Sequence, residues 1–145
     1  MKFIIQFFVS VFSMLMLSCC AGQQQIPDEG LYRQWMLVQF QDFKKEDFIK
    51  NQSYLDLSRT KSPKDHYRAK ISCNDLAIKA EFHPGNKVKF TPLIGSEMFC
   101  ENKMEMEKAF TTALPTMTAY KLEGQTLTLK NSKGEIMKFV AADWD

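Results

Sequence analysis

Four cysteines are the residues of this 145-residue chain whose chemistry depends most on their surroundings. Cys19 and Cys20 are adjacent, whereas Cys73 and Cys100 lie far downstream. Paired thiols outside the cytosol are joined as disulfides, and free thiolates bind soft metals or act as nucleophiles. A cysteine that follows an apolar leader can instead carry a lipid. The location of the chain therefore decides among these roles.

The first 18 residues have the composition of an export signal. Lys2 precedes an apolar run over residues 3–17 that contains no charge. Such a run is too short to span a bilayer and is typical of a secretory signal. Residues 16–19, Met-Leu-Ser-Cys, resemble the lipobox of bacterial lipoproteins, in which the cysteine becomes the acylated N-terminus. Since Ser18 and Leu17 precede Cys19, we expect lipidation of Cys19 rather than Cys20. A secreted protein without lipid is the alternative.

The expected location is the bacterial cell envelope, with the chain held by its N-terminal lipid. Several acyl chains anchor firmly, and the outer membrane is favoured because no aspartate follows Cys19 closely. The 19 basic residues minus Lys2 leave 18 against 17 acidic residues, a balance of +1 after cleavage. This balance, with lysines scattered among acids, argues against nucleic acid as a partner. The expected partners are the membrane and an unidentified envelope protein.

The mature chain has 145 − 18 = 127 residues, which suits a single domain. Residues 19–30 are rich in Gln, Gly and acid and predict a flexible tether, so the domain is expected over residues 31–145. A helix is predicted over residues 101–114, ended by Pro115. Alternation, apolar runs and turn residues predict eight short strands, at residues 35–40, 53–57, 67–73, 78–82, 88–90, 120–122, 127–129 and 136–140.

Short turns between successive strands require antiparallel pairing. The predicted fold is therefore mainly β (α+β), a curved antiparallel sheet or small barrel of about eight strands with one packed helix. Trp35 begins a strand that is apolar on both faces, and Phe110 lies on the single apolar face of the helix. Both are expected to be core residues.

Cys73 and Cys100 are expected to form a structural disulfide. The alternation over residues 67–73 turns Cys73 toward the core, and Cys100, just before the predicted helix, must pass over the same core. Export would place both thiols in an oxidising compartment.

A Cu(I) site is a real alternative, because thioether and thiolate ligands suit this ion. The candidate ligands are soft side chains close together in sequence: Met98, Cys100, Met104 and Met106, with Cys73. Against this, Met106 belongs to the apolar helix face and Met104 lies about 200° around the helix from it. We expect no metal and no cofactor.

Catalysis has little support in the sequence. A cysteine nucleophile needs a neighbouring base, but His66 is predicted on a polar strand face and His83 in a turn beside Pro84. Acid pairs such as Glu105 and Glu107 are surrounded by polar residues, so no raised pKa is expected for a general acid. We expect no enzymatic activity and no catalytic residues.

Three short motifs resemble the META domain, the family of the heat-shock lipoprotein HslJ. They are Trp35-Met36-Leu37 for W-x-L, Ser72-Cys73-Asn74 for G-C-N, and residues 96–100 for T-x-M-A-C, which includes Met98. Ser72 departs from the family glycine, and Ser96 and Phe99 replace the family Thr and Ala. The resemblance implies an envelope and stress-related setting and no established catalytic residues. Trp35, Asn74 and Met98 are the family-motif residues.

The expected function is a non-catalytic stress-related or interaction module. An envelope inhibitor of a cell-wall lytic enzyme is the alternative among binding proteins. Such inhibitors carry a Ser-Gly-x-x-Tyr loop, and this string does not occur in the sequence.

Overall fold

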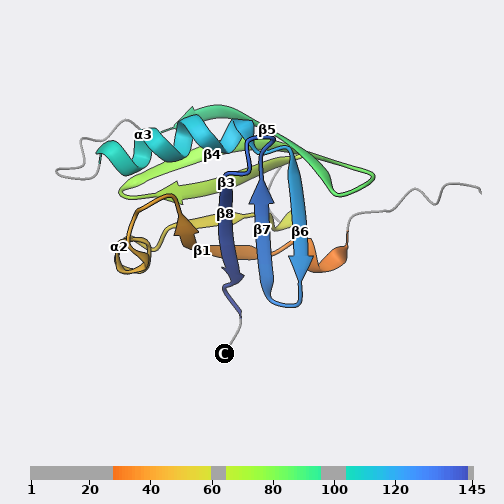
Figure 1. Cartoon of the computed structure of the whole chain (residues 1–145), viewed down its shortest axis with the longest axis horizontal. Coiled ribbons are helices and arrows are strands. Elements are labelled where there is room, and N and C mark those ends of the chain that lie inside the picture. The colour runs from red at the N-terminus through yellow and green to blue at the C-terminus, as the bar shows by residue number, and fades with distance from the viewer. Residues whose placement is uncertain (1–27, 60–64, 96–103, 144–145) are drawn as a thin grey trace, which may run out of the picture.

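The computed structural model describes residues 28–59, 65–95 and 104–143, which form a closed eight-stranded barrel (Figure 1). The strands are β1 (Gln34–Phe40), β2 (Tyr54–Asp56), β3 (His66–Ile71), β4 (Asn74–His83), β5 (Lys87–Gly95), β6 (Ala119–Glu123), β7 (Thr126–Lys130) and β8 (Ile136–Ala141). The helices are η2 (Glu29–Leu31), α2 (Lys45–Lys50), α3 (Met104–Ala113) and η4 (Leu114–Thr116).

Each strand pairs antiparallel with the next along the chain, and β1 pairs with β8 to close the barrel. The closing pair includes Trp35 opposite Ala141 and Leu37 opposite Phe139. The predicted fold class is confirmed, and of the two predicted forms the chain adopts the barrel. The segment 41–52 between β1 and β2 contains the short helix α2.

The barrel core follows from side chains that alternate along the strands. On β1, Trp35, Leu37 and Phe40 are buried, and they belong to the same hydrophobic cluster as Phe139 on β8 and Leu127 on β7. Leu37 and Phe40 are three positions apart, and the β1–β8 register shifts between Leu37 and Gln39, which restores the inward direction. The prediction that Trp35 is a core residue is confirmed.

Helix α3 packs on the barrel through one face, as its apolar spacing predicts. Met106, Phe110 and Ala113 are buried, and the Phe110 ring meets Phe40 edge to face with centroids 6.1 Å apart. In Figure 1, α3 runs along the top of the barrel. The predicted core position of Phe110 is confirmed; residues 101–103 of the predicted helix lie outside the described residues.

The prediction that Cys73 faces the core at the end of a strand is wrong. Strand β3 ends at Ile71, which pairs with Asn74, so Ser72 and Cys73 form a two-residue hairpin loop. Ser72 has φ +57° and is buried, whereas Cys73 is partly exposed. A positive φ at the first loop position ends the alternation, and glycine is favoured there. The chain therefore buries Ser72 and Asn74 instead of Cys73.

The contact between β5 and β6 is the shortest strand pairing in the described part of the barrel. Lys87 opposite Ala119 is its one register pair there. Two backbone hydrogen bonds flank it, Val88 N to Thr118 O at 3.1 Å and Tyr120 N to Asn86 O at 2.9 Å.

No helix among the described residues is long and apolar enough to cross a membrane.

Candidate functional site

The predicted site residues fall into two groups. Cys19, Met98 and Cys100 lie outside the described residues, so lipidation and the Cys73–Cys100 pairing stay predictions. Cys73 is itself disulfide-bonded in the structure. The motif residues Trp35 and Asn74 are fully buried.

Both described motif residues hold elements together. Trp35 Nε1 donates to the Leu31 carbonyl at 2.9 Å, which fixes η2 against β1. Asn74 Nδ2 donates to Glu107 Oε2 at 2.6 Å and ties the β3–β4 hairpin to α3. Neither side chain is available to a ligand.

Met104 and Met106, two of the candidate copper ligands, do not share a face of α3. Met104 is 48% exposed, whereas Met106 is 4% exposed in the core. His83 is exposed at the end of β4, and His66 is partly exposed at the start of β3. Among the described residues, no cluster of three or more His, Cys, Asp or Glu side chains is arranged to hold a metal ion.

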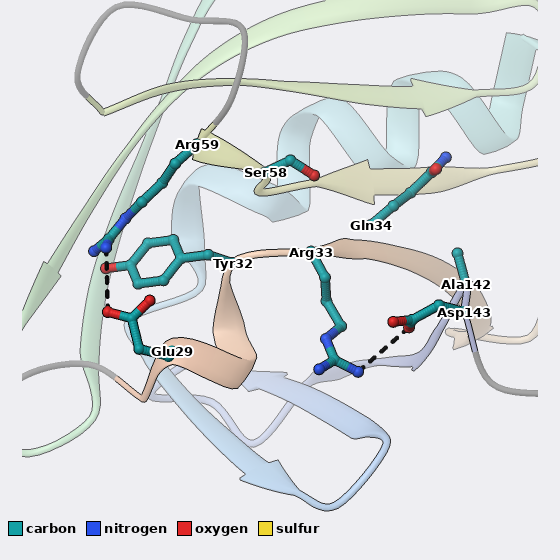
Figure 2. A pocket seen from close by; sticks show the side chains of 8 residues that line it. All are labelled: Glu29, Tyr32, Arg33, Gln34, Ser58, Arg59, Ala142 and Asp143. Atoms are coloured by element: carbon teal, nitrogen blue, oxygen red, sulfur yellow. Dashed lines mark hydrogen bonds and ion pairs between the residues drawn. The ribbon is translucent and has the colours of Figure 1, made fainter.

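A cleft of about 510 Å³ lies at the end of the barrel where β1 begins and where β2 and β8 end (Figure 2). We call it the end cleft. Its lining residues come from these three places: Glu29, Tyr32, Arg33, Gln34, Ser58, Arg59, Ala142 and Asp143.

One side of the end cleft is built around Arg59. Its guanidinium carbon lies 3.3 Å from the centroid of the Tyr32 ring, a cation–π contact, and its Nη1 donates to Glu29 Oε1 at 3.3 Å. Burial alone would lower the pKa of Arg59, but the hydrogen bond to Tyr32 and the charge of Glu29 raise it. The guanidinium therefore stays charged and is held against the ring.

The other side of the end cleft is built around Arg33. Its Nη1 donates to Gln125 Oε1 at 2.8 Å and to Asp143 Oδ1 at 3.3 Å. The guanidinium also lies 5.9 Å from the centre of the Trp35 ring system. Gln125, Asp143 and Trp35 thus all contact the Arg33 guanidinium. Of its two hydrogen bonds, the one to Asp143 is the longer.

Backbone hydrogen bonds fix the strand ends that carry these side chains. The Arg33 carbonyl accepts from Leu57 N at 3.0 Å, and the Gln34 carbonyl accepts from Ala142 N at 2.9 Å. The Asp56 side chain accepts from Ser58 N at 2.9 Å and shapes the chain after β2. The lining is therefore carried by a rigid end of the barrel.

Tyr32 links the end cleft to an aromatic cluster centred on Phe82. The Phe82 ring meets Tyr32, Tyr67, Phe90 and Tyr120 edge to face, at centroid distances of 5.5 to 6.5 Å. Burial, reinforced by nearby Tyr32, raises the pKa of both Tyr67 and Tyr120. These phenols are consequently neutral at physiological pH.

A second hollow of about 410 Å³ lies between α3 and the turn from β7 to β8. Its charged lining consists of Glu105, Lys108, Lys133 and Glu135. Arginine and aromatic side chains, which are enriched where proteins bind partners, line the end cleft and not this hollow. The end cleft is therefore the better candidate site.

Sequence reasoning missed the end cleft, because no local motif joins its residues. One signal was present. Arg33 lies just before the predicted strand 35–40, and Arg59 lies just after the predicted strand 53–57. Antiparallel pairing of these two consecutive strands brings those ends together.

A family model described as the META domain matches residues 29–144. Among solved structures, the chain is similar to a protein from Burkholderia xenovorans determined by NMR, with 20% identity and a TM-score of 0.62 over 78% of this chain and 83% of that one. It is also similar to a DUF4847 family protein from Bacteroides vulgatus ATCC 8482, with 10% identity and a TM-score of 0.58 over 79% of this chain and 95% of that one. These likenesses concern the fold alone. No curated protein sequence matches the chain.

Proposed function

Because the chain belongs to the META-domain family, we propose that it is a lipid-anchored, non-catalytic binding module of the bacterial envelope with a stress-related role. The observation that carries the binding role is the end cleft, where two arginines and an aromatic ring line about 510 Å³ of open space. The barrel interior is filled by side chains such as Trp35 and Phe139, so binding at the barrel end fits the structure better than binding inside it.

The leader and Cys19 support anchoring. Glu29, on the wall of the end cleft, is 29 − 19 = 10 residues after Cys19. A chain of this length spans at most about 35 Å when fully extended. An anchor at Cys19 would therefore keep the end cleft close to the membrane surface.

The chemistry of the lining supports a binding role over a catalytic one. Among the described residues, the lining of the end cleft includes no histidine or cysteine, and its acids, Glu29 and Asp143, are paired with arginines. Because each acid already has an arginine partner, the cleft does not present the nucleophile and neighbouring base that covalent catalysis needs.

Replacing Cys19 with Ser tests the anchor. We expect Cys19→Ser to leave the membrane fraction or to retain its leader, and the acyl mass to disappear from the mature chain. Cys20→Ser is the matched control and should stay lipidated in the membrane. A normally sized, membrane-bound Cys19→Ser protein would show that another residue carries the lipid.

A photo-crosslinking side chain at Gln34, inside the end cleft, tests the binding role in intact cells. We expect a crosslinked species from this position, and none from Lys50, an exposed residue on α2. The species should disappear when Arg33→Gln is added. Capture of a lytic glycosidase as the main partner would favour the inhibitor alternative, and equal capture from both positions would refute the end cleft as the binding surface.

A further inference from the structure

We propose that the end cleft binds a compact zwitterion, an amino acid or short peptide with a free ammonium group and a free carboxylate. This inference rests on the proposed function for its premise that the end cleft is a binding site. It adds the chemical class of the ligand, which follows from the charges and exposure of the lining residues.

The end cleft contains equal numbers of both charges. Arg33 is paired with Asp143, and Arg59 is paired with Glu29. A ligand with only a carboxylate would displace one of these acids from its arginine and leave it unpaired beside a second negative charge. A ligand with only an ammonium group would leave an arginine unpaired. A zwitterion exchanges partners with a whole ion pair, so every charge keeps a partner.

The arginines are better held than the acids. The Arg33 side chain is 33% exposed and Asp143 is 66% exposed, and Arg59 is 52% exposed against 82% for Glu29. If Asp143 moves away, Gln125 still holds Arg33 at 2.8 Å. If Glu29 moves away, the Tyr32 ring still contacts Arg59. The arginines are thus prepositioned for the ligand carboxylate, and the acids are free to turn to the ammonium group.

Partner exchange at these pairs costs little. Each arginine–acid contact is a single 3.3 Å contact on an exposed surface, and such pairs contribute little to stability. In Figure 2 the two pairs form separate groups on either side of the cleft, with Ser58 and Gln34 along its remaining edge. These two polar side chains can hydrogen-bond a peptide group, and about 510 Å³ is within the usual range for small-molecule sites.

A set of three dipeptides tests the charge requirement on the full chain as purified. Dialanine carries both charges, N-acetyl-dialanine carries only the carboxylate, and dialanine amide carries only the ammonium group. We expect dialanine to bind at least tenfold more tightly than either blocked form, measured by calorimetry or by NMR titration. Equal affinities for the three peptides, or no binding of dialanine at millimolar concentration, would refute the proposal.

Two variants locate the binding. Arg33→Gln should weaken dialanine at least tenfold. Asp143→Asn should selectively remove the preference for dialanine over N-acetyl-dialanine, because no displaced acid then requires the ammonium group. Glu123→Gln is the matched control, since it breaks an exposed Lys121–Glu123 pair of 2.7 Å outside the cleft and should change nothing. Unchanged dialanine affinity in Arg33→Gln, or a retained preference for dialanine in Asp143→Asn, would refute the assignment to this site.

Failure of this inference can be told apart from failure of the proposed function. Lipidation of Cys19 and crosslinking from Gln34 are measured without the dipeptides. Crosslinking that persists although dialanine does not bind would leave the binding module in place and remove the zwitterion.

Discussion

Ser72 occupies a backbone conformation that suits glycine. Its φ is +57°, it is 2% exposed, and its hydroxyl has no hydrogen-bond partner among the described residues. A left-handed residue with a Cβ costs about 1 to 2 kcal/mol, and a buried hydroxyl without a partner adds a further cost. These two costs give a physical reason for the glycine that the family carries at this position. This chain has serine there instead.

We expect Ser72→Gly to stabilise the domain by about 1 kcal/mol or more in chemical denaturation. Ser53→Gly is the matched control. Ser53 also buries a hydroxyl that has no hydrogen-bond partner in the described part of the chain, but its φ is not positive. Both variants remove a buried hydroxyl, so this gain is common to them. Glycine relieves the positive φ at position 72 but adds backbone entropy to the unfolded chain at position 53. Ser72→Gly should therefore be the more stable variant by about 1 to 2 kcal/mol. Equal effects would contradict backbone strain at Ser72.

At the scale of single residues, the sequence predicts which side chains are buried better than it predicts where a side chain in a turn points. Trp35 and Phe110 follow from periodicity, and both are buried. The orientation of Cys73 does not follow, because one positive φ at Ser72 reverses the alternation after Ile71. Arg33 and Arg59 were missed because their partners, Asp143 and Glu29, come from distant or irregular parts of the chain.

Helix α3 depends on Phe110 for its contact with the barrel. Phe110 is 1% exposed and packs on Phe40 of β1. Phe110→Ala should therefore lower the free energy of unfolding by about 3 to 5 kcal/mol, as expected for a buried aromatic residue. Lys108→Ala, at an exposed position of the same helix, should change stability by less than about 0.5 kcal/mol. A small loss for Phe110→Ala would mean that α3 is not held by this contact.

Three tyrosines, two of them in the aromatic cluster, make the domain sensitive to alkaline pH. Burial is the main cause that raises the pKa of Tyr54, Tyr67 and Tyr120 above their ordinary value. The folded chain therefore favours neutral phenols, while tyrosines in the unfolded chain ionise near pH 10. The contribution to stability is fully present below that pH and is lost as the pH rises through and above it.

We expect the tyrosines to leave the thermal unfolding midpoint unchanged below about pH 10 and to lower it above that pH. The fall should follow the rise in phenolate absorbance. Tyr67→Phe should make the fall less steep, since it removes one of the raised groups. An equally steep fall in Tyr67→Phe would show that other groups control alkaline unfolding.

Elements were predictable where the pattern is strong. The hairpin of β4 and β5 and helix α3 follow from alternation and from an apolar helical face, respectively. Their ends were less predictable, and β4 begins at Asn74 rather than at residue 78. Residues 74–77 are partly polar on both faces, so their strand conformation depends on pairing with β3 and not on local pattern.

For the whole molecule, we predict that Cys100 is the disulfide partner of Cys73. The two positions are 100 − 73 = 27 apart, and closing such a loop stabilises by roughly 3.5 kcal/mol on the chain-entropy model. Peptide mapping without reduction should recover a crosslinked pair from these segments, and replacing both residues with Ala should lower the melting temperature. A free thiol at Cys100 in protein taken from the envelope would contradict the pairing.

The choice between an open sheet and a barrel was beyond local sequence patterns. It depends on the pairing of β1 with β8, whose residues are about a hundred positions apart, and no local signal reports that contact. The same is true of the end cleft, which exists because β1, β2 and β8 end together.

The β1–β8 pairing also sets the order of events when the chain folds. Trp35 pairs with Ala141, so β1 keeps an unpaired edge on one side until β8 is in place. Contacts between such distant segments slow folding, and an open edge can pair with other chains in the interval. A chain truncated before β8 would keep that edge permanently and would be a substrate for chaperones and proteases.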